Sequence, residues 1–141
     1  MAIKIHDEQL KSVCDHAENT YPHECCGLLV GTGNDDIRKV ENVVKADNAR
    51  DKGARRKRFL INPEEFVSVE RKAHQDGLEV IGFYHSHPDA GARPSEYDLI
   101  HAWPWYSYVI VSVSDKGYGQ VTSWRLRDDR AKFDKENLII E

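Results

Sequence analysis

The sequence predicts an α/β (α+β) fold in which a mixed β-sheet is flanked by helices. Two features carry this prediction. Short apolar runs typical of buried strands occur along the whole chain, and between them lie segments whose apolar residues recur at helical spacing. No repeat, low-complexity segment or linker interrupts this order. Because 141 residues suffice for one ordinary hydrophobic core, we expect a single domain over residues 1–141.

The N-terminal part predicts a strand, a helix and a strand hairpin. Residues 3–5 alternate in polarity with their neighbours, and Asp7 is expected to cap a helix. The apolar residues of that helix recur at helical spacing: Leu10, Val13, Cys14 and Ala17. The helix should end before Pro22, because the residue preceding a proline disfavours the α conformation. Residues 25–31 are apolar on both faces, as in a central strand, and residues 37–46 should pair with them.

The middle of the chain predicts a polar loop, a second helix and a buried strand. Residues 47–58 carry six basic and two acidic side chains and nothing suited to a core, which indicates an exposed loop. Residues 59–61 are expected to form a short strand. Pro63 lies in the first turn of a helix that should run to Gly77, since proline is tolerated where its missing N–H would have no partner. Residues 78–87 then form another buried strand.

The C-terminal part predicts a third helix and the last strands. Residues 88–94 are rich in proline and glycine and indicate a loop, after which Ser95 caps a short helix that ends near Trp103. Residues 115–117 form a turn between two of the strands that follow. These last strands are expected at residues 108–112, 120–127 and 138–140, the final one at an edge of the sheet.

The composition excludes several classes of function. Twenty Lys and Arg against 24 Asp and Glu give a formal net charge of −4, whereas a dedicated nucleic-acid binder needs an excess of positive charge. An apolar run of about 18 residues for a membrane span is absent, and the first residues lack the apolar stretch of a signal peptide. Cys14, Cys25 and Cys26 lie in apolar surroundings and are expected to be reduced, which favours a cytoplasmic location.

One group of polar residues has the spacing of a metal site. His85 and His87 end an expected buried strand, and residues two apart on a strand point to the same face. Ser95 and Asp98 follow, one helical turn apart at the start of the third helix. Two imidazoles and one carboxylate are a ligand set that zinc uses in catalytic sites, with the fourth position left to water. These residues therefore indicate a hydrolytic zinc site.

Several of these residues also have a structural interpretation. Ser-x-x-Asp after a proline is the pattern of a capping box, which explains Ser95 and Asp98 without any metal. It does not explain two histidines at the mouth of an apolar strand. Ser86, between them, should point to the opposite face and hydrogen-bond internally. The remaining histidines are expected to be core or surface residues rather than metal ligands; they are His6, His16, His23, His74 and His101.

The pattern resembles a known family. The H-S/T-H-x7-S-x2-D signature of the JAMM (MPN-plus, Mov34/PAD-1) metalloproteases is reproduced without a gap by His85, Ser86, His87, Ser95 and Asp98. Residues 21–31 resemble the family's glutamate-bearing segment and place Glu24 as that glutamate. Asn48 and residues 58–63 look like the intermediate segment of bacterial members, so the resemblance covers nearly the whole chain. It implies a cytidine-deaminase-like fold, although deaminase activity is disfavoured because no Pro-Cys-x-x-Cys accompanies a His-x-Glu.

The resemblance also implies a role for each site residue. By it, His85, His87 and Asp98 bind zinc, and Glu24 is the general base that takes a proton from water and delivers it to the leaving amine. Ser95 would donate a hydrogen bond to the oxyanion of the tetrahedral intermediate. The alternative for Glu24 is a solvated surface acid. Its place immediately before an apolar strand argues against that, because an unpaired carboxylate is costly to bury.

A substrate class follows from the same resemblance. Members of this family cleave amide or isopeptide bonds after the C-terminal Gly-Gly of ubiquitin-like proteins, and small bacterial members resemble enzymes acting on sulfur-carrier proteins. We therefore expect a ubiquitin-like or sulfur-carrier protein as partner, with its extended tail docked beside a sheet edge. Residues 47–58 could contact an acidic carrier. The alternative is a zinc-holding but non-catalytic binding or scaffold module, and the oligomeric state is left open.

Overall fold

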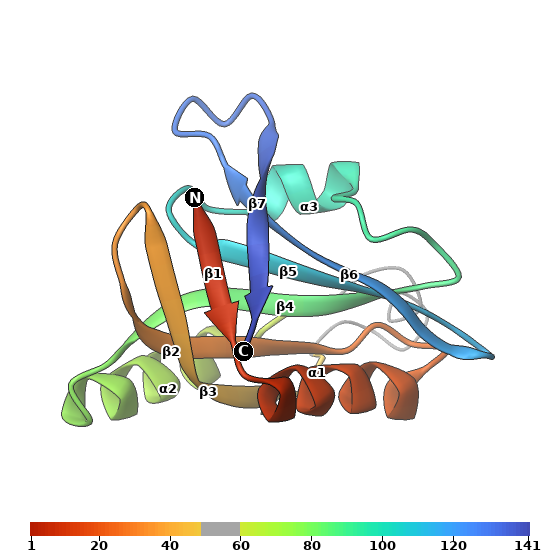
Figure 1. Ribbon diagram of the computed structural model, residues 1–141, viewed down its shortest axis with the longest axis horizontal. Coiled ribbons are helices and arrows are strands. Elements are labelled where there is room, and N and C mark those ends of the chain that lie inside the picture. The colour runs from red at the N-terminus through yellow and green to blue at the C-terminus, as the bar shows by residue number, and fades with distance from the viewer. Residues whose placement is uncertain (49–59) are drawn as a thin grey trace.

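Seven strands and three helices make up the part of the chain that the computed structural model describes, residues 1–48 and 60–141 (Figure 1). The strands are β1 Ala2–Ile5, β2 Cys26–Gly33, β3 Ile37–Ala46, β4 Glu79–Pro88, β5 Ser107–Ser114, β6 Gly117–Leu126 and β7 Phe133–Ile140. The helices are α1 Asp7–Thr20, α2 Pro63–Gln75 and α3 Glu96–His101. Within these residues, no helix combines the length and the apolar composition that crossing a membrane requires.

The strands form one mixed sheet that closes on itself in the order β1-β3-β2-β4-β5-β6-β7. Closure depends on β1, which pairs in parallel with β3 on one side and with β7 on the other, and β1 and β7 run side by side in Figure 1. The predicted mixed sheet is confirmed. A strand at residues 138–140 is present, as predicted, as the end of the longer strand β7; residues 138–140 pair with β1 alone, whereas residues 133–136 pair with β6.

Helices cover both faces of this sheet, as predicted. Successive residues of a strand point to opposite faces, so Leu28 and Leu29 of β2 enter two different cores. Leu29 lies in the core that α1 covers with Val13, Cys14 and Ala17. Leu28 lies in the core that α2 covers with Ala73 and Phe66. Both leucines are fully buried, and each contributes about 1.5–3 kcal/mol relative to exposure.

The first helix begins and ends close to its predicted limits. Its N-cap residue is His6 rather than Asp7, which lies inside the first turn, so the predicted cap is wrong by one position. The side chain of Gln9 accepts a hydrogen bond from the His6 N–H at 3.1 Å, as in half of a capping box. At the other end the helix stops at Thr20, before the Tyr21–Pro22 peptide, as predicted.

The segment before α2 differs from the prediction. Leu60 and Ile61 belong to no strand. The N–H of Leu60 donates to the side chain of Asn48 at 3.0 Å instead of to a neighbouring strand, which explains the difference. Residues 49–59, which include most of the predicted polar loop and the first residue of the predicted short strand, lie outside the described residues.

All three cysteines are free and buried, as expected for reduced core thiols. Burial raises the pKa of Cys14 and of Cys25 to about 11, and it raises the pKa of Cys26 further still. Because the thiolate is the nucleophile, we expect none of the three to react rapidly with a disulfide reagent at pH 8 in the native protein. Spectrophotometric titration should count three thiols only after denaturation, and rapid native labelling would contradict this burial.

Candidate metal centre

The end of β4 brings two imidazoles together. His85 and His87 are two residues apart, so both rings project from the same face of the strand, as predicted. Their Nε2 atoms lie 3.1 Å apart, and the residues are 1% and 8% exposed. Ser86 points to the opposite face, where its hydroxyl accepts a hydrogen bond from the Cys25 N–H at 2.8 Å. The predicted internal role of Ser86 is confirmed.

The first turn of α3 adds a carboxylate to the two imidazoles. Asp98 Oδ2 lies 3.3 Å from Nε2 of His85 and 3.2 Å from Nε2 of His87. Ser95 is the N-cap residue of this helix, and its hydroxyl accepts from the Asp98 N–H at 3.1 Å while Asp98 Oδ2 accepts from the Ser95 N–H at 2.8 Å. The capping box considered from the sequence is therefore present. It orients the carboxylate toward the histidines, so the two interpretations of this pair are compatible.

The spacing of these three atoms fits a tetrahedrally coordinated cation. Zinc lies about 2.0–2.2 Å from nitrogen and oxygen ligands, so two ligands of a tetrahedral ion are about 3.3–3.6 Å apart. The three observed separations are 3.1, 3.2 and 3.3 Å, so they lie at or slightly below the short end of that range, and a small outward shift of the side chains would admit the ion. His87 Nδ1 also lies 3.0 Å from the carbonyl oxygen of Gly91, which fixes the ring proton on Nδ1 and leaves the Nε2 lone pair for a ligand bond.

Glu24 lies beside this triad, immediately before β2. It is 3% exposed, and one of its carboxylate oxygens comes within 4.8 Å of ring nitrogens of both His85 and His87. A bridging water can span such a gap. The same two histidines could therefore share a metal with Glu24 or with Asp98. The separations of 3.2 and 3.3 Å show that Asp98 Oδ2 is close enough to share a metal with both imidazoles, and the bound of 4.8 Å for Glu24 is compatible either with a ligand or with a group that acts on a water.

The charge states of the three triad residues are coupled. Burial lowers the pKa of His85, which favours its neutral form. Burial also acts to lower the pKa of His87, but the hydrogen bonds to Asp98 and Gly91 outweigh it and raise that pKa. Burial acts to raise the pKa of Asp98, but the two imidazoles and the Ser95 N–H hold it well below its usual range. The carboxylate is therefore ionised, and a cation binding here competes only with protons on the imidazoles.

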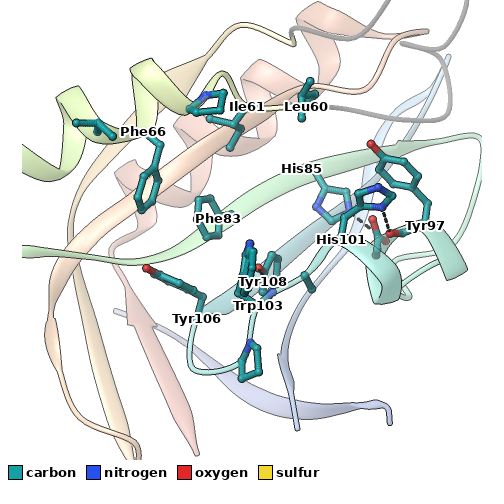
Figure 2. A pocket seen from close by; sticks show the side chains of 15 residues that line it. Leu60, Ile61, Phe66, Phe83, His85, Tyr97, His101, Trp103, Tyr106 and Tyr108 are labelled. Carbon is teal, nitrogen blue, oxygen red and sulfur yellow. Dashed lines mark hydrogen bonds and ion pairs between the residues drawn. The ribbon is translucent and has the colours of Figure 1, made fainter. Parts of the chain in front are cut away.

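An apolar cavity of about 610 Å³ opens next to the triad (Figure 2). His85 and Asp98 are among its lining residues, and Figure 2 shows His85 beside Tyr97 and His101. Its walls come from two separate parts of the chain, with Leu60, Ile61, Pro63, Phe66 and Val67 on one side and Tyr97, His101, Ala102, Trp103, Pro104, Tyr106 and Tyr108 on the other, and Phe83 of β4 between them. The candidate metal centre thus borders this cavity, which we call the aromatic groove.

Sequence reasoning missed this groove. Its walls are brought together only by the packing of α2 and of the segment after α3 against β4, and helical or strand spacing does not reveal that. The aromatic cluster at residues 103–106 was the available signal. Of the remaining histidines, His16 has a structural role, with Nδ1 2.7 Å from the Tyr84 hydroxyl. His101 lines the groove and contacts the Tyr97 carbonyl oxygen through Nδ1.

The sequence of this chain is similar to that of a known domain family and of several named proteins. Residues 6–127 match the family described as prokaryotic homologs of the JAB domain. The chain is 34% identical over 113 residues to a desampylase of Haloferax volcanii, covering 79% of this chain and 78% of that protein. It is 29% identical to a desampylase of Pyrococcus furiosus, covering 84% of this chain and 76% of that protein. It is 24% identical to the deubiquitinase BRCC36 of Rattus norvegicus, covering 93% of this chain and 53% of that protein.

Solved structures agree with this placement. A protein of Desulfitobacterium hafniense is 30% identical and superposes with a TM-score of 0.84, covering 100% of this chain and 93% of the other. A JAB1/MPN domain protein of Archaeoglobus fulgidus shares the fold at 19% identity, with a TM-score of 0.55 and 99% of both chains covered. The predicted family and its fold are thereby confirmed: the chain belongs to the prokaryotic homologs of the JAB/MPN domain.

Proposed function

We propose that this chain is a zinc-dependent metallopeptidase that hydrolyses the amide or isopeptide bond after the C-terminal Gly-Gly of a ubiquitin-like or sulfur-carrier protein. The observation that carries the proposal is the convergence of His85 Nε2, His87 Nε2 and Asp98 Oδ2 within 3.3 Å of one another, beside the buried Glu24. Relatives named desampylase and deubiquitinase support a metal-dependent isopeptidase, which is a hydrolase.

Each residue of the centre has a separate task in this proposal. His85, His87 and Asp98 hold the zinc ion, which when bound supplies a Lewis acid and a water acidic enough to react near neutral pH. Glu24 accepts a proton from the attacking water at a carboxylate oxygen and returns it to the nitrogen of the leaving amine. Its burial keeps bulk water from competing for that proton.

Ser95 is the proposed donor to the oxyanion. Its hydroxyl already accepts from the Asp98 N–H, which leaves the O–H free to donate. Ser95→Ala is therefore expected to lower kcat about 10²-fold through loss of that donor, and to lower the free energy of unfolding by about 1 kcal/mol through loss of the cap. Kinetics and chemical denaturation should be measured together. A variant that is destabilised but retains wild-type kcat would show that Ser95 caps the helix and does not donate to the oxyanion.

The groove accounts for recognition of an extended tail. Docking of the tail beside a sheet edge, as expected from the sequence, is compatible with the closed sheet, because residues 40–46 of β3 pair with β2 alone among the described strands. The aromatic groove is a further place for the tail, because His85 and Asp98 are among its lining residues. Glycines at the end of the tail would let its backbone approach these buried side chains closely. Larger apolar side chains farther along the tail would fill the groove.

Turnover of a defined adduct tests the proposal. The substrate is a ubiquitin-like or sulfur-carrier protein joined through its C-terminal Gly-Gly to a peptide, assayed with zinc-loaded protein, after chelation and after zinc is restored. We expect cleavage that is lost with the chelator and recovered with zinc, and no cleavage of an adduct whose Gly-Gly is replaced by two bulky residues. Stoichiometric zinc binding without turnover would instead indicate the non-catalytic binding module.

A further inference from the structure

The peptide group that joins Glu24 to Cys25 is held at both of its polar atoms by side chains. The carbonyl oxygen of Glu24 accepts a hydrogen bond from Nδ2 of Asn48 at 3.1 Å. The N–H of Cys25 donates to the hydroxyl of Ser86 at 2.8 Å. This peptide group precedes the first residue of β2, Cys26, at which pairing with β3 and β4 begins. Side chains thus fix the backbone immediately before the ladder.

Both side chains are themselves fixed. Oδ1 of Asn48 accepts from the Leu60 N–H at 3.0 Å, so the amide can present only Nδ2 to Glu24. Ser86 is fully buried on β4, and its own N–H donates to the Cys25 carbonyl oxygen at 3.2 Å. The N–H and C=O of a peptide group point in opposite directions. One donor and one acceptor on opposite sides therefore select a single orientation of the peptide plane.

That orientation determines where the Glu24 carboxylate points. Rotating the peptide plane changes ψ of Glu24, and with it the position of this residue relative to β2 and β4. We propose that Asn48 and Ser86 are positioning residues that hold the Glu24–Cys25 peptide so that the carboxylate faces His85 and His87. The proposal rests on the proton-transfer role of Glu24 in the proposed function. A displacement of about 1 Å in a catalytic group can cost about 10²-fold in rate.

A double-mutant cycle tests this coupling. Asn48→Ala and Ser86→Ala are each expected to lower kcat about tenfold while the bound metal stays at the wild-type level. Because both release the same peptide group, the double variant should also lose about tenfold, rather than the about hundredfold expected of independent effects. Ser86→Thr keeps the hydroxyl and should restore kcat. Asn34→Ala is the matched control, since Asn34 also accepts backbone N–H groups, but at the β2–β3 turn.

Amide hydrogen exchange provides a readout that does not depend on turnover. Asn48→Ala should speed exchange at the Cys25 amide about tenfold or more, although Asn48 bonds to the carbonyl end of that peptide group. Exchange at Leu29, inside β2, should be unchanged. Asn48→Asp keeps the acceptor for the Leu60 N–H and removes the donor to Glu24, so it should lower kcat without raising KM. This variant tests the inference if either alanine variant fails to fold.

The outcomes separate this inference from the proposed function. A wild type that cleaves no Gly-Gly adduct would overturn the proposed function, and Cys25 exchange would still decide whether the peptide group is held as described. If the wild type is active, the inference is overturned when kcat changes less than twofold in Asn48→Ala and Ser86→Ala. It is also overturned when the losses in the two single variants multiply in the double variant. Loss of metal in Asn48→Ala would also overturn it, because Asn48 would then support the metal site rather than Glu24.

Discussion

Replacing Glu24 by glutamine is expected to leave metal binding intact and to lower kcat at least about 10²-fold. Glutamine has the size and nearly the shape of glutamate, so the buried site before β2 should remain filled. It cannot accept a proton at the reaction pH, so the attacking water would lose its base and the leaving amine its proton donor. Metal content by mass spectrometry and steady-state kinetics on the Gly-Gly adduct give the two readouts.

Glu96→Gln is the matched control for Glu24→Gln. Glu96 is an exposed glutamate in the first turn of α3, the helix that carries Asp98, and its replacement should leave kcat and metal content unchanged. If Glu24→Gln cleaved substrate at the wild-type rate, proton transfer by Glu24 would be ruled out. If it lost its metal, Glu24 would belong to the ligand set, an arrangement that its distance from the two histidines permits.

Replacing one of the proposed metal ligands is the second change with a large expected effect. It should remove the metal and, with it, the activity. Asp98→Asn is the sharpest variant, because its amide oxygen can still accept from the Ser95 N–H and preserve the helix cap. It lacks the negative charge that zinc requires of a carboxylate ligand. We expect metal affinity to fall by more than about 10²-fold, and kcat at limiting metal to fall with it. His87→Ala should behave alike, since it removes one of two imidazoles.

The control for the ligand variants is His74→Ala. His74 lies exposed on α2 and away from the centre, so its loss should leave metal affinity and the free energy of unfolding nearly unchanged. Competition with a chromogenic chelator measures the affinity of each variant. Wild-type affinity in Asp98→Asn would remove Asp98 from the ligand set and leave its capping role alone.

Local spacing was enough to predict part of this centre. His85 and His87 share a face because a strand repeats every two residues, and Asp98 is one helical turn from its cap, so both relations follow from the sequence. Glu24 has no such relation to them. Its approach depends on the antiparallel pairing of β2 with β4, which places Cys26 opposite His85. Only the family resemblance pointed to it.

Local sequence patterns could not predict the closure of the sheet or the groove. Closure requires the first and last strands of the chain to pair in parallel, and nothing in the short apolar runs at residues 3–5 and 138–140 specifies a partner. The groove likewise depends on the packing of Phe66 from α2 and Tyr106 from the segment after α3 around Phe83. Such contacts are set by tertiary structure, where periodicity carries no information.

Anomalous diffraction on either side of the zinc absorption edge, from crystals of the zinc-loaded protein, tests the central claim most directly. We predict a single peak per chain, bonded to His85 Nε2, His87 Nε2 and Asp98 Oδ2 at about 2.0–2.2 Å, with the Glu24 carboxylate near it but not bonded. A peak bonded to Glu24 in place of Asp98, or no zinc signal at this site, would contradict the account.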